Sequence, residues 1–135
     1  MVGQSILILG GGTAGVAAAN VLRKLLPLRH QITLVDRQAY HVFKAGFPLV
    51  PVRHRRPNEL IRPLDGLRQI GVEFIQAEVI AADLTHQIIH TSIGNLTYDY
   101  LVIALGAELS PESIPGFRDA AFNAYSLEHL SLLAA

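Results

Sequence analysis

The sequence contains no cysteine and no tryptophan, and only 16% of its 135 residues are charged. The absence of cysteine excludes disulfide bonds, thiolate metal ligands and a redox-active dithiol within these residues. The formal net charge is zero, so no excess of positive charge favours nucleic acid as a partner. No apolar run approaches the ~18 residues that a membrane-spanning helix requires.

Half of the residues are apolar, which favours a folded α/β domain with a buried sheet over a disordered chain. The charges are unevenly distributed along the chain. Nine Lys/Arg and two Asp/Glu occur up to Arg62, whereas two Lys/Arg and nine Asp/Glu follow from Pro63 onward. This asymmetry indicates either a surface that receives anions or a basic loop and an acidic sheet edge that neutralise each other.

The first third of the chain is typical of one β-α-β unit. The apolar run "SILIL" at residues 5–9 predicts a strand buried on both faces. Apolar residues recur at near-helical spacing over residues 13–26, and Pro27 ends this helix. Residues 31–36 predict a second strand. Because the first strand begins so early, a signal peptide is not expected and we predict a cytoplasmic protein.

Residues 37–58 predict a long loop, because they contain three prolines and a run of basic side chains. A loop of this length in a compact domain is usually functional or mobile. Residues 59–71 predict a short helix that is interrupted near Pro63 and ended by Gly71.

From Val72 the pattern changes to three strand-like segments, at residues 72–84, 87–93 and 96–105. Turn signals at residues 83–86 and at Gly94-Asn95 separate them, with no helix between. We therefore predict an α/β, Rossmann-like fold, in which a three-stranded antiparallel β-meander replaces the second crossover before "YLVIAL" returns to the parallel sheet. Residues 110–117 predict a loop, and Ser126 is expected to cap a final helix.

Gly10, Gly12 and Gly15 fit the pattern G-x-G-x-x-G between the first strand and its helix. In this pattern the first glycine permits a tight turn, the second lets a pyrophosphate approach the backbone, and the third lets helix and strand pack closely. The first-turn N–H groups, including those of Thr13 and Ala14, then form an anion site. The alternative is a tight turn without a ligand, although close packing alone would not require three adjacent glycines.

Asp36 ends the second strand, 21 residues after Gly15. A carboxylate at this place can accept hydrogen bonds from ribose hydroxyls, and it would repel a 2′-phosphate. The sequence therefore predicts a dinucleotide site that disfavours NADP. The glycine turn by itself does not distinguish FAD from NAD.

The stretch "LTYDYLVIALGAELSPESIPGF" resembles the second signature of the pyridine nucleotide-disulfide oxidoreductase superfamily, the flavoproteins with two dinucleotide-binding domains. Members carry Y-D-x-L-V-I-A-T-G followed by a Pro-Gly pair, which residues 98–106 and Pro115-Gly116 match with Leu105 in place of threonine. "YHVFKAGFPLV" and "AYSLEHLSLL" are most similar to the branch of type II NADH dehydrogenases and sulfide:quinone oxidoreductases.

The resemblance implies that the cofactor is FAD and that its ADP half lies at the glycine turn and Asp36. Val79 would offer its backbone to the adenine, and residues 104–106 would lie near the flavin. Lys44 would lie near the isoalloxazine ring, although a solvated loop lysine is the more favoured alternative. The residues expected to bind the cofactor are Gly10, Gly12, Thr13, Ala14, Gly15, Asp36, Arg37, Lys44, Val79, Ala104, Leu105 and Gly106.

The resemblance further implies that residues 1–110 are the N-terminal part of an FAD-binding domain and residues 111–135 lead towards an NAD(P)H-binding domain outside this chain. The parent protein would pass electrons from NAD(P)H through FAD to a quinone or a similar acceptor, and this part alone is expected to be inactive. The catalytic residues stay unassigned. A sulfide:quinone oxidoreductase is the first alternative, which the absence of cysteine after the second signature disfavours. A regulatory nucleotide-sensing module that binds NAD is the second, and the consecutive strands from Val72 disfavour it.

Other patterns concern partners. No pair of histidines has metal-ligand spacing, so no metal site is predicted. The basic segment "RHRR" at residues 53–56 indicates either peripheral contact with anionic lipid at the inner face of the membrane or, as the more favoured alternative, a solvated loop. A sheet edge left open by a missing strand would favour a homodimer.

Overall fold

The structure is a computed structural model that describes residues 2–134. These residues divide into two compact units. The first unit comprises Met1–His41 and Arg62–Gly106, and the second comprises Val42–Ile61 and Ala107–Ala135.

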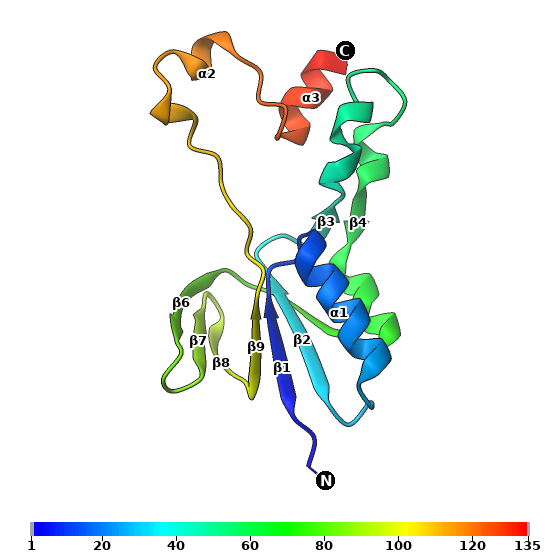
Figure 1. Cartoon of the computed structure of the whole chain (residues 1–135), viewed down its shortest axis with the longest axis vertical. Coiled ribbons are helices and arrows are strands. Elements are labelled where there is room, and N and C mark those ends of the chain that lie inside the picture. Colours follow the sequence, from blue (N-terminus) through cyan, green and yellow to red (C-terminus); the bar gives the residue numbers. More distant parts are fainter. Residues whose placement is uncertain (1, 135) are drawn as a thin grey trace. The chain divides into compact units, whose positions relative to one another are not determined.

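The first unit contains a four-stranded parallel sheet with the strand order β5-β2-β1-β9 (Figure 1). Helix α1 connects β1 to β2, as the sequence predicted, and it ends at Leu25, one residue earlier than predicted. The bounds of these elements are Ser5–Leu9 for β1, Thr13–Leu25 for α1, Gln31–Asp36 for β2, Glu73–Gln76 for β5 and Tyr100–Ile103 for β9.

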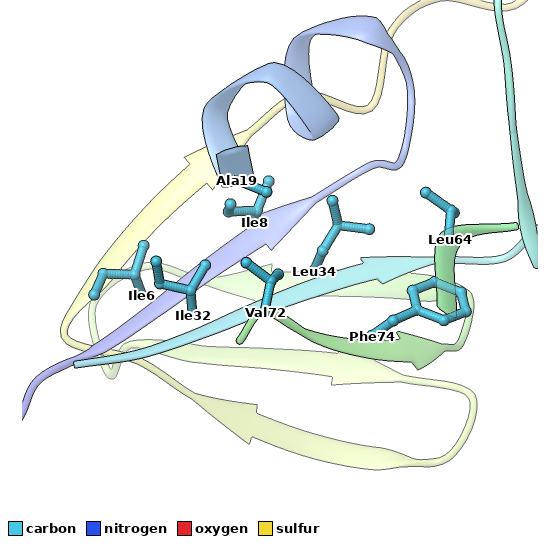
Figure 2. Close-up of a cluster of buried hydrophobic side chains, with 8 residues drawn as sticks. All are labelled: Ile6, Ile8, Ala19, Ile32, Leu34, Leu64, Val72 and Phe74. Carbon is cyan, nitrogen blue, oxygen red and sulfur yellow. The ribbon is translucent and has the colours of Figure 1, made fainter. Parts of the chain in front are cut away.

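The continuous apolar run of β1 supplies both faces of this sheet. Successive side chains of a strand point to opposite faces, so Ile6 and Ile8 pack in a cluster with Ala19 of α1 (Figure 2). Leu7 and Leu9 pack in a second cluster on the other face, together with Ile89. Because both faces of β1 are buried, its sequence lacks the alternation of apolar and polar residues that a half-exposed strand shows.

The second face of the sheet is covered by an antiparallel meander of β6 (Val79–Asp83), β7 (Ile88–Thr91) and β8 (Gly94–Thr97). The predicted meander and the return of β9 to the parallel sheet are thus confirmed. Residues 72–84, predicted as one strand-like segment, form two strands in different sheets. The Gly94-Asn95 turn was also misplaced, because both residues belong to β8 and the turn lies at residues 92–93.

The prediction of a long loop at residues 37–58 missed three short elements. This segment contains β3 (Tyr40–Val42) and the 3-10 helices η1 (Lys44–Leu49) and η2 (Pro57–Leu60). The helix predicted at residues 59–71 is instead divided into the end of η2, β4 (Ile61–Pro63), which pairs with β3, and η3 (Leu64–Ile70). Gly71 ends η3 in the left-handed conformation, as expected. Pieces this short carry no hydrophobic period, so the sequence did not reveal them.

The second unit has its own small core, in which Phe47, Val50 and Leu60 pack with Leu130 of the last helix. Its remaining elements are η4 (Pro111–Ser113), α2 (Phe117–Ala120) and α3 (Leu127–Ala134). Ser126 stands at the predicted cap of α3, and its hydroxyl accepts from the N–H of His129 at 3.5 Å. The expected loop at residues 110–117 contains η4. Across residues 2–134, none of the helices has the length and apolar character to cross a membrane.

Candidate nucleotide-binding site

The carboxyl ends of the four parallel strands meet at one edge of the main sheet, which collects most of the predicted site residues. Residues 10–12 follow β1, Arg37 follows β2, residues 77–79 follow β5, and residues 104–106 follow β9. The helical crossover leads from β1 to β2 on one side, whereas β9 lies on the other side of β1. Such a switch point in strand order is where open α/β sheets bind their ligands.

Gly10 makes the tight turn that the motif assigns to the first glycine. Its φ of +104° is a conformation that residues with a side chain rarely adopt, and an added Cβ would overlap the carbonyl oxygen of Ala104. Its N–H donates to the carbonyl of Val35 at 2.7 Å, while the N–H of Ala104 donates to that of Leu9 at 2.8 Å. The turn is therefore fixed between its two neighbouring strands.

Gly15 provides the close approach of helix to strand that the motif assigns to the third glycine. It is buried in the first turn of α1, and a Cβ there would overlap the carbonyl oxygen of Gly10. The glycine thus lets the first turn of α1 pack directly against the turn that follows β1.

Gly12 differs from both, because a Cβ at this position would meet no atom within 4 Å. Its φ of −71° is accessible to any residue. It stands at the N-cap of α1, yet no side chain makes a capping hydrogen bond and the first turn contains no acidic residue. The first N–H groups of a helix lack intrahelical partners. Packing alone therefore does not explain this glycine, whereas an anion that approaches the open, uncapped helix end does.

Asp36 lies next to the turn and holds part of it. Its Oδ2 accepts a hydrogen bond of 2.5 Å from the N–H of Gly11, and its Oδ1 accepts one of 2.7 Å from that of Gln38. A carboxylate offers about four acceptor sites, so capacity remains for the ribose hydroxyls that the sequence analysis assigned to it. The strand-end acid thus also stabilises the turn, which the sequence did not predict.

Two residues beside this turn were missed by the sequence analysis. Gly11 is buried, and a Cβ on it would lie 2.5 Å from a methyl carbon of Leu64 and 3.2 Å from a carboxylate oxygen of Asp36. His41 contacts the same residue, since its Nδ1 lies 2.9 Å from the carbonyl oxygen of Gly11. The three consecutive glycines were a signal for Gly11; the contact with His41 depends on β3, which was not expected.

The remaining predicted residues of the first unit lie at the same edge. The exposed Arg37 receives a hydrogen bond of 3.1 Å on its carbonyl from Gln76, and the half-buried Val79 opens β6. Ala104 is half-buried, Leu105 is exposed, and Gly106 has a φ of +77°. Thr13 and Ala14 are exposed in the first turn of α1.

Lys44 belongs to the second unit, where its ammonium has a specific partner. The Nζ atom lies 4.2 Å from the ring centroid of Tyr125, a distance typical of a cation–π contact. The side chain is exposed and has an aromatic partner within its own unit. Its predicted position near a flavin stays a prediction.

Titratable and metal-binding chemistry is sparse in this part of the molecule. Within residues 2–134, no group of three or more His, Asp and Glu side chains is placed to bind a metal. Hydrogen bonds lower the pKa of Asp83, chiefly from His86, and that of Asp99, chiefly from the backbone of Ser5. Both carboxylates lie outside the glycine turn, so the site offers backbone donors and Asp36 rather than an acid–base pair.

Comparison with known families agrees with this geometry. The sequence profile described as pyridine nucleotide-disulphide oxidoreductase matches residues 4–133. The chain belongs to this family. Its members are FAD-dependent oxidoreductases, so the family, the enzyme class and the cofactor expected from the two signatures agree with this assignment. A regulatory NAD-sensing module is not supported.

Similar proteins come from both expected branches of the family. The chain is 32% identical over 127 residues to a type II NADH:quinone oxidoreductase of Staphylococcus haemolyticus, covering 93% of this chain and 32% of the relative. It is 33% identical over 108 residues to a sulfide-quinone reductase of Aquifex aeolicus, covering 78% of this chain and 25% of the relative. The chain thus spans a quarter to a third of the length of these relatives.

Solved structures confirm the fold. The sulfide:quinone oxidoreductase of Aquifex aeolicus superimposes with a TM-score of 0.88 at 29% identity, over 97% of this chain and 30% of that chain. NDH2 of Plasmodium falciparum superimposes with a TM-score of 0.77 over 98% of this chain and 28% of that chain, and its 20% identity shows the fold alone.

Proposed function

We propose that residues 1–110 form the amino-terminal part of an FAD-binding domain, and that residues 111–135 lead towards an NAD(P)H-binding domain. The complete enzyme would pass electrons from NAD(P)H through FAD to a quinone or a similar acceptor. This chain alone would bind the cofactor without turnover. Membership of the family and similarity to a type II NADH:quinone oxidoreductase support this proposal.

The observation that carries the proposal is the open end of α1. Gly12 is the glycine of the motif that has no packing reason, and the helix end beside it lacks a capping side chain. Two phosphate groups that are joined to a ribose fit this arrangement, because backbone N–H groups would bind the phosphates and Asp36 would accept from the ribose. The residues present therefore fit the ADP half of FAD.

A bound flavin would supply the hydride-accepting and electron-transfer chemistry. The residues of this chain bind and orient it. Gly10, Gly12 and Gly15, with Thr13 and Ala14, would hold the pyrophosphate, and Asp36 with Arg37 would hold the ribose. Val79 would contact the adenine through its backbone. Residues 104–106 would lie on the flavin side.

An absorbance spectrum tests the proposal. The purified chain is incubated with excess FAD, free ligand is removed, and retained flavin absorbance and fluorescence quenching are measured. Gly12→Val is the matched variant, because its side chain would fill the open site without an internal clash. We expect wild type to retain flavin and Gly12→Val to lose it while it still unfolds cooperatively, with a slightly lower melting temperature because valine is a poorer N-cap than glycine. Equal retention, or binding of NAD but not FAD or ADP by wild type, contradicts the proposal.

The sulfide:quinone oxidoreductase reading is the second candidate, and the relative from Aquifex aeolicus supports it. The absence of cysteine in these 135 residues favours an NADH dehydrogenase-like enzyme, in which transfer through flavin needs no thiol. The two readings are separated by the donor. A complete enzyme of the proposed kind should reduce a quinone with NADH rather than with sulfide.

We also propose that the complete enzyme is cytoplasmic and meets the inner face of the membrane peripherally. The basic segment 53–56 supports this, as do Leu49 and Val52 beside it, which are 41% and 60% exposed. Cosedimentation with vesicles tests it. Binding to phosphatidylglycerol vesicles should exceed binding to phosphatidylcholine vesicles and disappear when Arg55 and Arg56 are replaced by glutamine. Equal binding to both vesicles contradicts the electrostatic contact.

A homodimer through β9 is the last part of the proposal. Among the described strands β9 is an edge strand of the main sheet, and its Tyr100 and Ile103 are 56% and 60% exposed. An open edge with apolar side chains favours pairing with a second copy. Light scattering should therefore give twice the monomer mass, whereas a strict monomer at high concentration contradicts the dimer.

A further inference from the structure

The carbonyl group of Gly11 is held by a side chain that the sequence motif does not include. His41 lies in β3, and its Nδ1 is 2.9 Å from the carbonyl oxygen of Gly11, across thirty positions of the sequence. Asp36 holds the N–H of the same glycine at 2.5 Å. The middle glycine of the turn is therefore fixed at both of its backbone polar groups.

The direction of the His41 hydrogen bond follows from its partner. A carbonyl oxygen only accepts hydrogen bonds, so Nδ1 of His41 must carry the proton. Two other histidines are held the opposite way, because Nδ1 of His30 accepts from the N–H of Gln4 and Nδ1 of His129 accepts from that of Asn123. The neutral forms of these three histidines are thus expected to differ in tautomer.

A carbonyl that is held in place also fixes the N–H of the next residue. The peptide bond is planar and trans here, so the C=O of Gly11 and the N–H of Gly12 point in opposite directions. Holding the carbonyl toward His41 therefore turns the N–H of Gly12 away from His41. Gly12 is also the residue with open space at its Cβ position.

We propose that His41 is a positioning residue of the glycine turn, which aims the Gly12 N–H at the pyrophosphate of a bound adenine nucleotide. This inference rests on the proposed nucleotide site and adds a residue outside the G-x-G-x-x-G pattern. Without this bond the peptide between Gly11 and Gly12 could rotate. Ordering its N–H would then cost free energy on binding, which weakens the affinity. Loss of one positioned hydrogen bond is expected to weaken binding about five- to tenfold.

A matched pair of variants separates the hydrogen bond from the bulk of the ring. In His41→Asn the side-chain amide nitrogen takes the place of Nδ1, whereas His41→Leu has a similar size and no donor. His86→Leu is the control, since His86 is an exposed histidine of the β6–β7 turn and contacts Asp83 instead. ADP is the probe, and its affinity is measured by calorimetry for wild type and the three variants.

The expected result is a five- to tenfold weaker ADP affinity for His41→Leu, near wild-type affinity for His41→Asn, and no change for His86→Leu. Equal affinity of wild type and His41→Leu, or equal loss in both His41 variants, overturns the inference. Nitrogen NMR of the wild-type chain provides a second test without ligand. A protonated Nδ1 on His41, with unprotonated Nδ1 on His30 and His129, supports the assignment, and an unprotonated Nδ1 on His41 overturns it.

The amide signal of Gly12 distinguishes the failure of this inference from the failure of the proposed function. If wild type binds neither ADP nor FAD, the proposed nucleotide site is wrong. The Gly12 amide shift still decides the positioning role in that case. A shift that changes in His41→Leu and returns in His41→Asn supports it, whereas a shift that is the same in all three chains contradicts it.

Discussion

Asp99, in the turn before β9, accepts hydrogen bonds at its Oδ2 from the backbone N–H of Ser5 at 2.6 Å and from the Ser5 hydroxyl at 3.0 Å. The backbone N–H of Asp99 in turn donates to the carbonyl of Ser5 at 2.9 Å. These bonds connect the start of β9 to the start of β1, so the pair fixes the register in which the two parallel strands meet. Both residues lie at the end of the sheet opposite the glycine turn.

Acid is expected to weaken this connection. The hydrogen bonds from Ser5 lower the pKa of Asp99, so the folded state binds this proton less readily than the unfolded state does. The stabilisation is therefore complete above the unfolded value of about 3.9 and is lost as the pH falls through the lower folded value. Urea unfolding of wild type and Asp99→Asn should show a stability difference at pH 6 that shrinks below pH 4. A difference that is independent of pH contradicts this linkage.

Arg23 is expected to be the most sensitive polar side chain of the first unit. It is only 9% exposed, and its guanidinium donates at 2.7–3.3 Å to the carbonyl groups of Leu26, Pro27, His30 and Gly71. It thereby holds the segment that follows α1 and joins it to Gly71, the residue that ends η3. Arg23→Met should lower the free energy of unfolding by about 2–4 kcal/mol. Arg23→Lys should not restore it, since a single ammonium cannot reach four separate acceptors. Wild-type stability in either variant contradicts this role.

The glycines of the turn should differ in what they contribute. Gly15→Ala would overlap the carbonyl of Gly10 and should cost about 1–3 kcal/mol in thermal or chemical unfolding. Gly12→Ala meets open space and a common φ, so it should cost less than about 1 kcal/mol, the small loss that alanine causes in place of glycine at an N-cap. Nucleotide affinity should respond differently. Gly12→Ala should weaken binding although it changes the free energy of unfolding little. Equal destabilisation by both substitutions contradicts this division of roles.

The contact between Lys44 and Tyr125 should be measurable as a coupling energy. Both residues are in the second unit, and the Asn123 side chain orients Tyr125 by accepting from its backbone N–H at 2.8 Å. A double-mutant cycle with Lys44→Gln and Tyr125→Leu should give about 0.5–1 kcal/mol of coupling, as is typical of exposed cation–π pairs. Tyr125→Phe should preserve it, because the ring face is retained. A coupling energy near zero from this cycle would show that the contact contributes nothing to stability.

The sequence by itself determined the elements that depend on local patterns. The apolar run of β1 and the helical period of α1 reflect periodicities of neighbouring residues, and the structure confirms both. The strand-like character after Val72 was also predicted, although residues 72–84 and 96–105 each divide between two strands of different sheets. The distinct purposes of Gly10 and Gly15 could also be predicted, since a tight turn and a close helix–strand approach are steric requirements that only glycine meets.

Only the tertiary structure decided which distant groups meet at the turn. His41 reaches Gly11 because β3 forms, and β3 exists through its pairing with β4, which is too short to leave a periodic signal. Leu64 lies against Gly11 through η3, a contact that the prediction of a helix in this stretch did not reveal. Hydrogen bonds and contacts of this kind depend on where separate segments pack, and a pattern of neighbouring residues does not encode that placement.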